Sequence, residues 1–271
     1  MPDIVVHLIA CAAYVGLAWH FWTTRWRGRT GGGLRGWERA AILAPLALHG
    51  WLLYDGIFAA ASLRFGFAQA LSVMMFLGVA VYWIESLFYP LDGMEPLVLP
   101  LAALAVPLPA LFPGLASSGA HAQAGAFKLH LAFAMIAYSL FIIALMHATL
   151  MAVAERQLHR KSGLAFAHLP PLLTLERLLF RMIGAAFVFL TLTLVSGIVF
   201  SETLFGRPMR SDHKTIFAIL SWVTFGWLLA GRWLWGWRGR TAVRWTLGGF
   251  VLLVLAYVGS RFVLEVILQR S

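Results

Sequence analysis

Histidines within apolar segments are the residues of this sequence best suited to chemistry. His49 lies in LALHGWLL, His130 in KLHLAF, and His213 at the start of the apolar run after SD. Polar and ionisable residues are expensive inside a membrane, so those present are the places to look for function. A lone histidine in an apolar helix is more often a packed or hydrogen-bonded residue than a ligand. We apply that interpretation to His147, which follows His130 along the same segment.

Depth distinguishes His130 and His213 from the other histidines. Both fall at the outer boundary of a predicted membrane helix, and two imidazoles at one level could ligate a haem iron axially. The neighbouring Lys128, Asp212 and Lys214 suit either a rim that binds propionates or charged side chains that reach for water. Two histidines at helix starts are equally consistent with interfacial residues that contact water, and both interpretations stay open.

Motifs of soluble enzymes are absent from the sequence. It contains no GxSxG, HExxH or Walker loop, so nothing favours a hydrolase or a phosphoryl transferase. Cys11 is the only cysteine, which excludes an intrachain disulfide and a metal site with several cysteines. The stretch from Gly31 to Gly33 follows no strand, and we expect a flexible loop there and not a phosphate cradle.

The composition indicates the elements that must position these histidines. Hydrophobic residues make up 61% of the 271 residues and charged residues 12%, which leaves too few polar side chains to cover a soluble globule. Runs of about 20 apolar residues predict membrane-spanning helices. The sequence therefore predicts an all-α polytopic integral membrane protein with about eight transmembrane helices, at 3–22, 40–60, 66–88, 96–113, 127–153, 176–201, 214–231 and 245–268. The prolines of the fourth segment predict a kinked or shortened helix.

Basic residues predict the orientation. Three loops hold most of the arginines, and loops rich in lysine and arginine stay in the cytoplasm. Both termini are then outside, as in a multi-pass protein of a bacterial inner membrane. Asp3 stands where a signal peptide would have a basic region, so we expect the first segment to be a retained helix. The net charge of +10 reflects this topology and attraction to membrane lipid, and we expect no nucleic-acid partner.

One loop on the predicted cytoplasmic side departs from this pattern. The segment between the third and fourth helices carries Glu85, Asp92 and Glu95 and no basic residue. Acidic residues weigh little in the rule, so the predicted orientation stands.

Several segments resemble a known family in their order along the chain. LALHGWLLYDG is followed by a histidine-led helix, LHLAFAMIAYSLFIIALMHATLMAVAE, with Tyr138 eight residues after its histidine. PPLLTLERLLFRMIG, DHKTIFAILSW and GWRGRTAVRWTLGGFV come after it. Together they resemble the CcsA-type cytochrome c assembly proteins, and among them the YpjD-like inner membrane proteins. The resemblance implies one domain of this kind over 1–271.

The resemblance also implies site residues. Four histidines bind haem in CcsA-type proteins, two at the outer side and two within the membrane. His130 matches the first outer ligand and His49 the first intramembrane ligand, so both are expected to bind the metal of a haem b cofactor. His213 is expected as a local replacement for the missing outer partner.

The remaining family features differ in this sequence. The second intramembrane ligand falls at Ala230 and the second outer ligand near Ile267 or Leu268, and none of these is a histidine. The outer loop from Ser201 to Asp212 contains no tryptophan, although the family presents haem on a tryptophan-rich outer loop. The resemblance therefore implies an accessory in haem handling or cytochrome c biogenesis and not the ligating enzyme.

Other functions stay open at this stage. No catalytic residues are expected, and the partners implied are membrane lipid, haem and other membrane or cytochrome-assembly proteins. A non-catalytic membrane scaffold is one alternative. A transport or ion-homeostasis component is another, against which the chain shows no inverted repeat and almost no carboxylate at mid-membrane depth.

Overall fold

The computed structural model describes residues 4–27, 31–58, 63–114, 116–117, 124–159, 169–205 and 213–263. Nearly all of these residues are helical. The elements are α1 (Ile4–Phe21), η1 (Trp22–Trp26), α2 (Gly36–Phe58), β1 (Leu63–Arg64), α3 (Phe67–Phe88), α4 (Glu95–Ala105), α5 (Leu108–Leu111), β2 (Ala116–Ser117), α7 (Gly125–His159), α8 (Leu172–Phe205), α9 (His213–Trp235), α10 (Gly239–Val254), η2 (Leu255–Gly259) and α11 (Ser260–Phe262).

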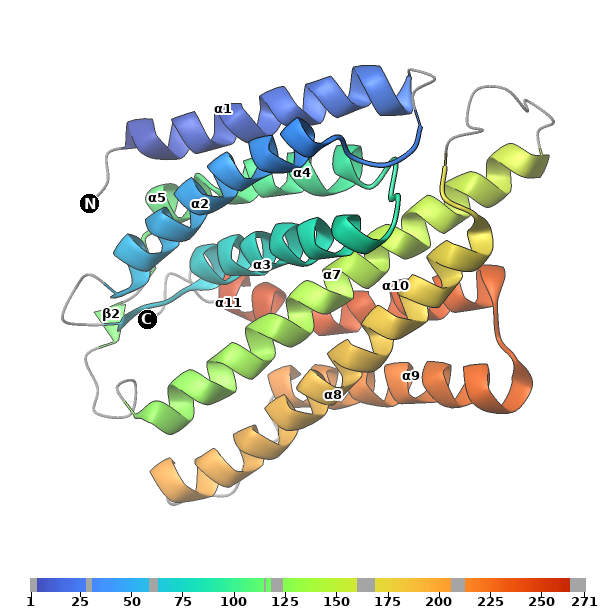
Figure 1. Cartoon of the computed structure of the whole chain (residues 1–271). Coiled ribbons are helices and arrows are strands. Elements are labelled where there is room, and N and C mark those ends of the chain that lie inside the picture. The colour runs from blue at the N-terminus through green and yellow to red at the C-terminus, as the bar shows by residue number, and fades with distance from the viewer. Residues whose placement is uncertain are drawn as a thin grey trace.

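The long helices pass back and forth through one bundle, from side to side in Figure 1. Within the described residues, seven helices are long and apolar enough to cross a membrane, and Glu95–Leu111 is a shorter apolar helix. The prediction of an all-α membrane protein with about eight helices is thereby confirmed. The start of α1 and the short α11 lie at the same end of the bundle, on the left of Figure 1. We call this the outer end, following the distribution of arginines.

Proline explains why the fourth segment is short. Pro100 lies inside α4, and α4 ends at Ala105 just before Pro107. Proline has no N–H to donate and clashes with the preceding turn. The chain therefore continues only as the single turn of α5, and the kinked or shortened helix expected from the sequence is present.

Several helix limits differ from the predicted spans. At 35 residues, α7 is about 52 Å long, which exceeds a hydrocarbon core of roughly 30 Å. It packs along its length against the similarly long α8, and both cross the other helices obliquely (Figure 1). The last span begins at Gly239 and not at 245, because Arg240 and Arg244 belong to the first turns of a helix that the charge pattern assigned to a loop.

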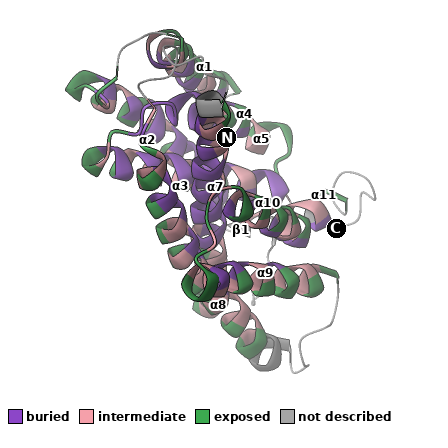
Figure 2. Ribbon diagram, turned by 90° about the vertical axis from the view of Figure 1, so that its right-hand side faces the viewer, coloured by how far each residue is buried: buried purple, intermediate pink, exposed green. Residues whose placement is uncertain are grey.

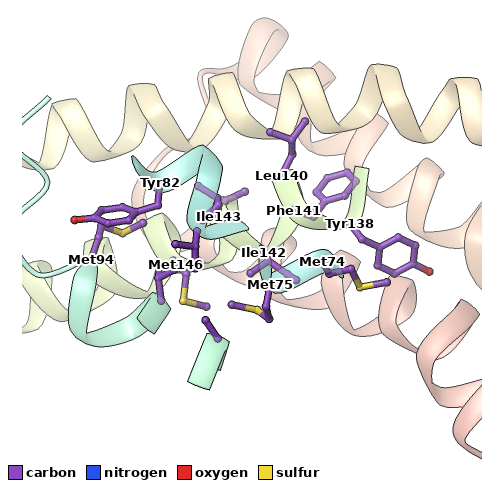
Figure 3. Packing of buried hydrophobic residues seen from close by; sticks show 14 of the residues in the cluster. Met74, Met75, Tyr82, Met94, Tyr138, Leu140, Phe141, Ile142, Ile143 and Met146 are labelled. Atoms are coloured by element: carbon purple, nitrogen blue, oxygen red, sulfur yellow. The ribbon is translucent and has the colours of Figure 1, made fainter. Parts of the chain in front are cut away.

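The core lies where α3 and α7 pack together, and Figure 2 shows both helices buried at the centre of the bundle. Large apolar side chains of α3 and α7, and of the residue that precedes α4, fill this region, including Met74, Phe141 and Met94 (Figure 3). α1 contributes Tyr14 and Phe21, both fully buried. The first segment is therefore a packed member of the bundle, and α8 and α9 remain more exposed on its outside (Figure 2).

Buried charges join the cytoplasmic ends of several helices. The Arg25 guanidinium donates to Asp92 through Nη1 and to Glu38 through Nη2, each at 2.6 Å. Asp92 also accepts the backbone N–H groups of Gly32 and Gly33, at 3.0 and 2.9 Å. Both glycines have positive φ, a conformation that other residues rarely adopt. The glycine stretch is therefore not simply a flexible loop, because a carboxylate from a distant segment fixes its backbone.

This cluster explains the acidic loop that departs from the charge pattern. The carboxylates of Asp92 and Glu85 are not free in the cytoplasm but are buried against partners from other helices. Asp92 pairs with Arg25, and Glu85 lies 3.0 Å from Nε2 of His147. The partners of these carboxylates therefore come from elsewhere in the chain, His147 from α7 and Arg25 from the end of the first span.

Candidate functional site

A cavity of about 360 Å³ opens among the helices of the second half, toward the outer end of the bundle. Its volume is in the lower part of the range of roughly 300–1,000 Å³ that ligand pockets occupy. Most of its lining comes from α7, α8 and α9, and the rest from η2 and Phe65. The lining residues are Phe65, Phe127, His130, Leu131, Ala134, Met135, Tyr138, Thr193, Leu194, Gly197, Lys214, Thr215, Ala218, Ala256 and Tyr257.

The lining is mainly apolar and aromatic, with a few polar groups. The hydroxyl of Tyr138 donates to the carbonyl oxygen of Leu253 at 2.7 Å, so this side chain is held in place against the last membrane helix. Tyr257 lies against it, with ring centroids 6.5 Å apart. Lys214 adds a positive charge from the first turn of α9. A flat, largely apolar ligand with acidic substituents matches such walls.

The hydrogen bonds of His130 determine which ring nitrogen carries a lone pair. Ser196 lies on α8 and its hydroxyl donates to the carbonyl oxygen of Thr193 at 3.1 Å. The hydroxyl oxygen of Ser196 also lies 2.9 Å from Nδ1 of His130. Because the serine proton is already used, the imidazole donates from Nδ1 and the serine oxygen accepts. We assign the proton to Nδ1 on this basis, which leaves Nε2 as the nitrogen able to bind a metal.

A glycine of α8 makes room for this imidazole. A Cβ atom at Gly197 would lie 3.3 Å from Cε1 of His130, which is tighter than ordinary packing. Phe200, one turn further along α8, presents its ring at 81° to the imidazole. The sequence SGIVF after Val195 thus supplies the hydrogen-bond acceptor, the space and an aromatic contact for one histidine.

His49 lies in a different environment and does not line the cavity. It is almost completely buried between α1 and α3. Its Nε2 is 2.9 Å from the hydroxyl of Ser72, and its Nδ1 is 3.5 Å from that of Tyr14. The edge of Phe76 packs against the ring. The structure therefore does not bring His49 and His130 together, as expected for one outer and one intramembrane position.

His213 is exposed at the first residue of α9. It does not line the cavity, although the next two residues, Lys214 and Thr215, do. Of the charged residues expected at a rim, Lys214 lies at the cavity, Lys128 does not line it, and Asp212 lies outside the described residues. Within the part of the chain that the structure describes, no three histidine, cysteine, aspartate or glutamate side chains cluster as a metal site would require.

Two further histidines lie against buried carboxylates. His20 lies 3.2 Å from the buried carboxylate of Glu38. His147 is fully buried against Glu85. Each carboxylate belongs to a different helix from its histidine, so the sequence alone does not indicate the pairing. The one indication is that an unpaired carboxylate is unfavourable in an apolar environment.

Ser196 and Gly197 contact His130, but the sequence did not indicate either residue. A serine within an apolar helix usually bonds to its own backbone, and Ser196 does so. Its second role, as acceptor for His130, depends on the packing of α8 against α7. The adjacent serine and glycine within LVSGIVF are the available signal, since small residues mark close helix contacts in membranes.

The sequence is similar to a known family and to several known membrane proteins. Residues 40–268 match the model of a family described as cytochrome C assembly protein. The inner membrane protein YpjD of Escherichia coli is 35% identical over 51% of this chain and 52% of its own length. An uncharacterized 28.8 kDa protein of Azospirillum brasilense is 36% identical over 52% of each chain.

A more distant relative carries a functional name. The cytochrome c biogenesis protein CcsA of Guillardia theta is 29% identical over 49% of this chain and 50% of its own. The chain spans about half the length of the curated relatives that it matches. No solved structure matches it.

Proposed function

Because the chain belongs to the cytochrome c assembly protein family, we propose that it handles haem during cytochrome c biogenesis. In this proposal it acts as an accessory in a bacterial inner membrane, as one domain over its whole length, and not as the enzyme that attaches haem. The multi-pass helical architecture and the similarity to an inner membrane protein of Escherichia coli support the location. The cavity beside His130 supports the proposed binding of haem.

The single observation that carries the proposal is the arrangement of His130. The imidazole lines an apolar cavity, and its Nδ1 is held by Ser196. A histidine whose second nitrogen donates to a fixed acceptor is oriented and made more basic as a metal ligand. Haem b, when bound, supplies an iron that accepts such a nitrogen and changes oxidation state. The residues present therefore fit the group.

Other residues of the cavity have complementary roles. The aromatic and aliphatic walls exclude water from a flat macrocycle. Lys214 at the outer rim offers a positive charge to propionates. His213, its exposed neighbour, does not line the cavity but stays a candidate in this proposal for a second residue that would hold the iron.

His49 stays a second proposed ligand, at a separate site deeper in the bundle. The hydroxyl of Ser72 lies 2.9 Å from its Nε2, so iron binding through that nitrogen requires this hydrogen bond to be exchanged. His130 needs no such exchange, which makes it the first site to test.

The experiment is an absorption spectrum of the protein purified in detergent and loaded with haem, oxidised and reduced. We expect the wild type to show a Soret band near one haem per chain, and His130→Ala to lose most of it. Ala218→Trp is expected to have the same effect, because its larger side chain fills the cavity without removing a ligand. His130→Ala and Ala218→Trp should unfold at the wild-type SDS concentration.

Two controls make this result specific. Ala185→Trp places the same side chain on exposed α8 surface outside the cavity and should retain the band. His49→Ala reports separately on the deeper site. A wild-type protein that stays colourless after loading with haem contradicts the proposal and favours a non-catalytic scaffold.

A further inference from the structure

A second cavity, of about 440 Å³, lies at the opposite, cytoplasmic end of the bundle, between α7 and α10. Arg156, Arg240 and Arg244 line it, together with one carboxylate, that of Glu155. Nε of Arg240 donates to Glu155 at 2.9 Å. The lining therefore carries two positive charges more than it carries negative ones.

Two of these arginines have their charge available to a ligand. Within the described residues, neither Arg156 nor Arg244 has an ion-pair partner, and both side chains are exposed. Guanidinium groups bind phosphate oxygens in bidentate pairs. The cavity thus has the charge and the donors for one or two phosphate groups.

The remaining lining residues are apolar and lie deeper. Ala152 precedes Arg156 by one turn of α7, and Val243 and Leu247 follow Arg240 along α10. Leu247 lies about 10 Å further into the bundle than Arg240, at 1.5 Å per residue. A ligand that occupies the cavity therefore meets cations at the level of the headgroups and aliphatic side chains below them.

We infer that this cavity binds the headgroup of an anionic phospholipid from the cytoplasmic leaflet. Basic pockets between membrane helices on that side bind anionic headgroups, and a phospholipid with two phosphodiesters matches the excess of two positive charges. Its acyl chains lie along Ala152, Val243 and Leu247. The site is remote from the cavity of His130 and does not depend on haem binding.

The test is a lipid titration of the delipidated protein followed by native mass spectrometry. Cardiolipin, which carries two phosphates, is the probe, and phosphatidylcholine is the comparison lipid. Arg156→Gln with Arg244→Gln is expected to weaken cardiolipin binding roughly thirty-fold, because each arginine near the membrane surface contributes about five-fold to the affinity. Arg177→Gln, an exposed arginine of α8 outside the cavity, should leave the affinity unchanged.

Three results would overturn the inference. The double variant could bind cardiolipin as tightly as the wild type, or Arg177→Gln could weaken binding as much, which would show a diffuse surface charge. Inorganic phosphate could displace cardiolipin at equal concentration, which would show a site for a soluble anion. Because Arg156 and Arg244 are exposed, their replacement should leave the fold intact, and circular dichroism checks that the double variant is folded.

Discussion

At the scale of single residues, the proposed binding of iron depends on which ring nitrogen of His130 is free. The hydroxyl of Ser196 donates to the carbonyl oxygen of Thr193 and, in the assigned tautomer, accepts from Nδ1 of His130. The serine then sets the tautomer as well as the orientation of the ring. A ligand prepared in this way loses less entropy when it binds iron. The sequence predicted His130 as a ligand, but it gave no indication of Ser196, because the contact joins residues 66 positions apart.

Ser196→Ala tests this arrangement without touching the ligand itself. Loss of such an outer hydrogen bond typically costs about 10–100-fold in metal affinity. We expect haem affinity to fall within that range, measured by titration of the haem-free protein at the Soret band. Ser139→Ala, which removes a hydroxyl that bonds only to its own helix at Met135, should leave the affinity unchanged. Equal affinities for all three proteins would show that Ser196 does not set the tautomer.

At the scale of elements, the helices that carry the cavity are held by close contacts at small residues. The hydroxyl of Ser221 on α9 donates to the carbonyl oxygen of Gly249 on α10 at 3.0 Å. A Cβ atom at Gly249 would lie 2.8 Å from Cζ of Phe225. The Phe225 ring cannot retreat easily, because it stacks on Phe141 with centroids 3.9 Å apart. This packing joins α9 and α10 to α7.

Two adjacent glycines provide a matched comparison for this contact. Gly249→Ala is expected to lower the free energy of unfolding by roughly 1–3 kcal/mol, because overpacking forces neighbours to move. Gly248→Ala meets nothing within 4 Å and is expected to raise it by about 0.5–1 kcal/mol, because alanine loses less chain entropy in a helix. Unfolding in SDS followed by circular dichroism measures both, and equal effects would contradict the close packing.

At the scale of the whole molecule, a buried ionic cluster ties the first half together. Arg25, at the end of the first span, holds the carboxylates of Glu38 and Asp92, and Asp92 in turn holds the glycine loop. All three charged side chains are nearly inaccessible to solvent. Their loss should therefore affect the stability of the whole first half and not one loop.

Arg25→Ala leaves two buried carboxylates without their partner. Breaking a buried ion pair in this way typically destabilises by about 3–5 kcal/mol, and we expect a decrease of that size in the free energy of unfolding in SDS. Arg27→Ala removes an exposed arginine two residues away and should change it little. A stability of Arg25→Ala equal to that of Arg27→Ala would contradict the role of the cluster.

The sequence predicted most of the architecture because a membrane constrains it strongly. The length of the apolar runs predicted the helices, and the arginine distribution predicts their orientation across the bilayer. It did not predict the start of α10, since Arg240 and Arg244 at a cytoplasmic helix end resemble a loop. It also did not predict the pairing of Arg25 or His147, because such contacts depend on how distant helices pack.

The central claim is that His130 is the axial ligand of a bound haem. Its most direct test is to replace the ligand with a small residue and supply the missing imidazole in solution. We expect haem-loaded His130→Gly to have an altered Soret band, and added imidazole to restore the wild-type spectrum by occupying the space beside Ser196. A His130→Gly spectrum identical to that of the wild type before imidazole is added would contradict the claim.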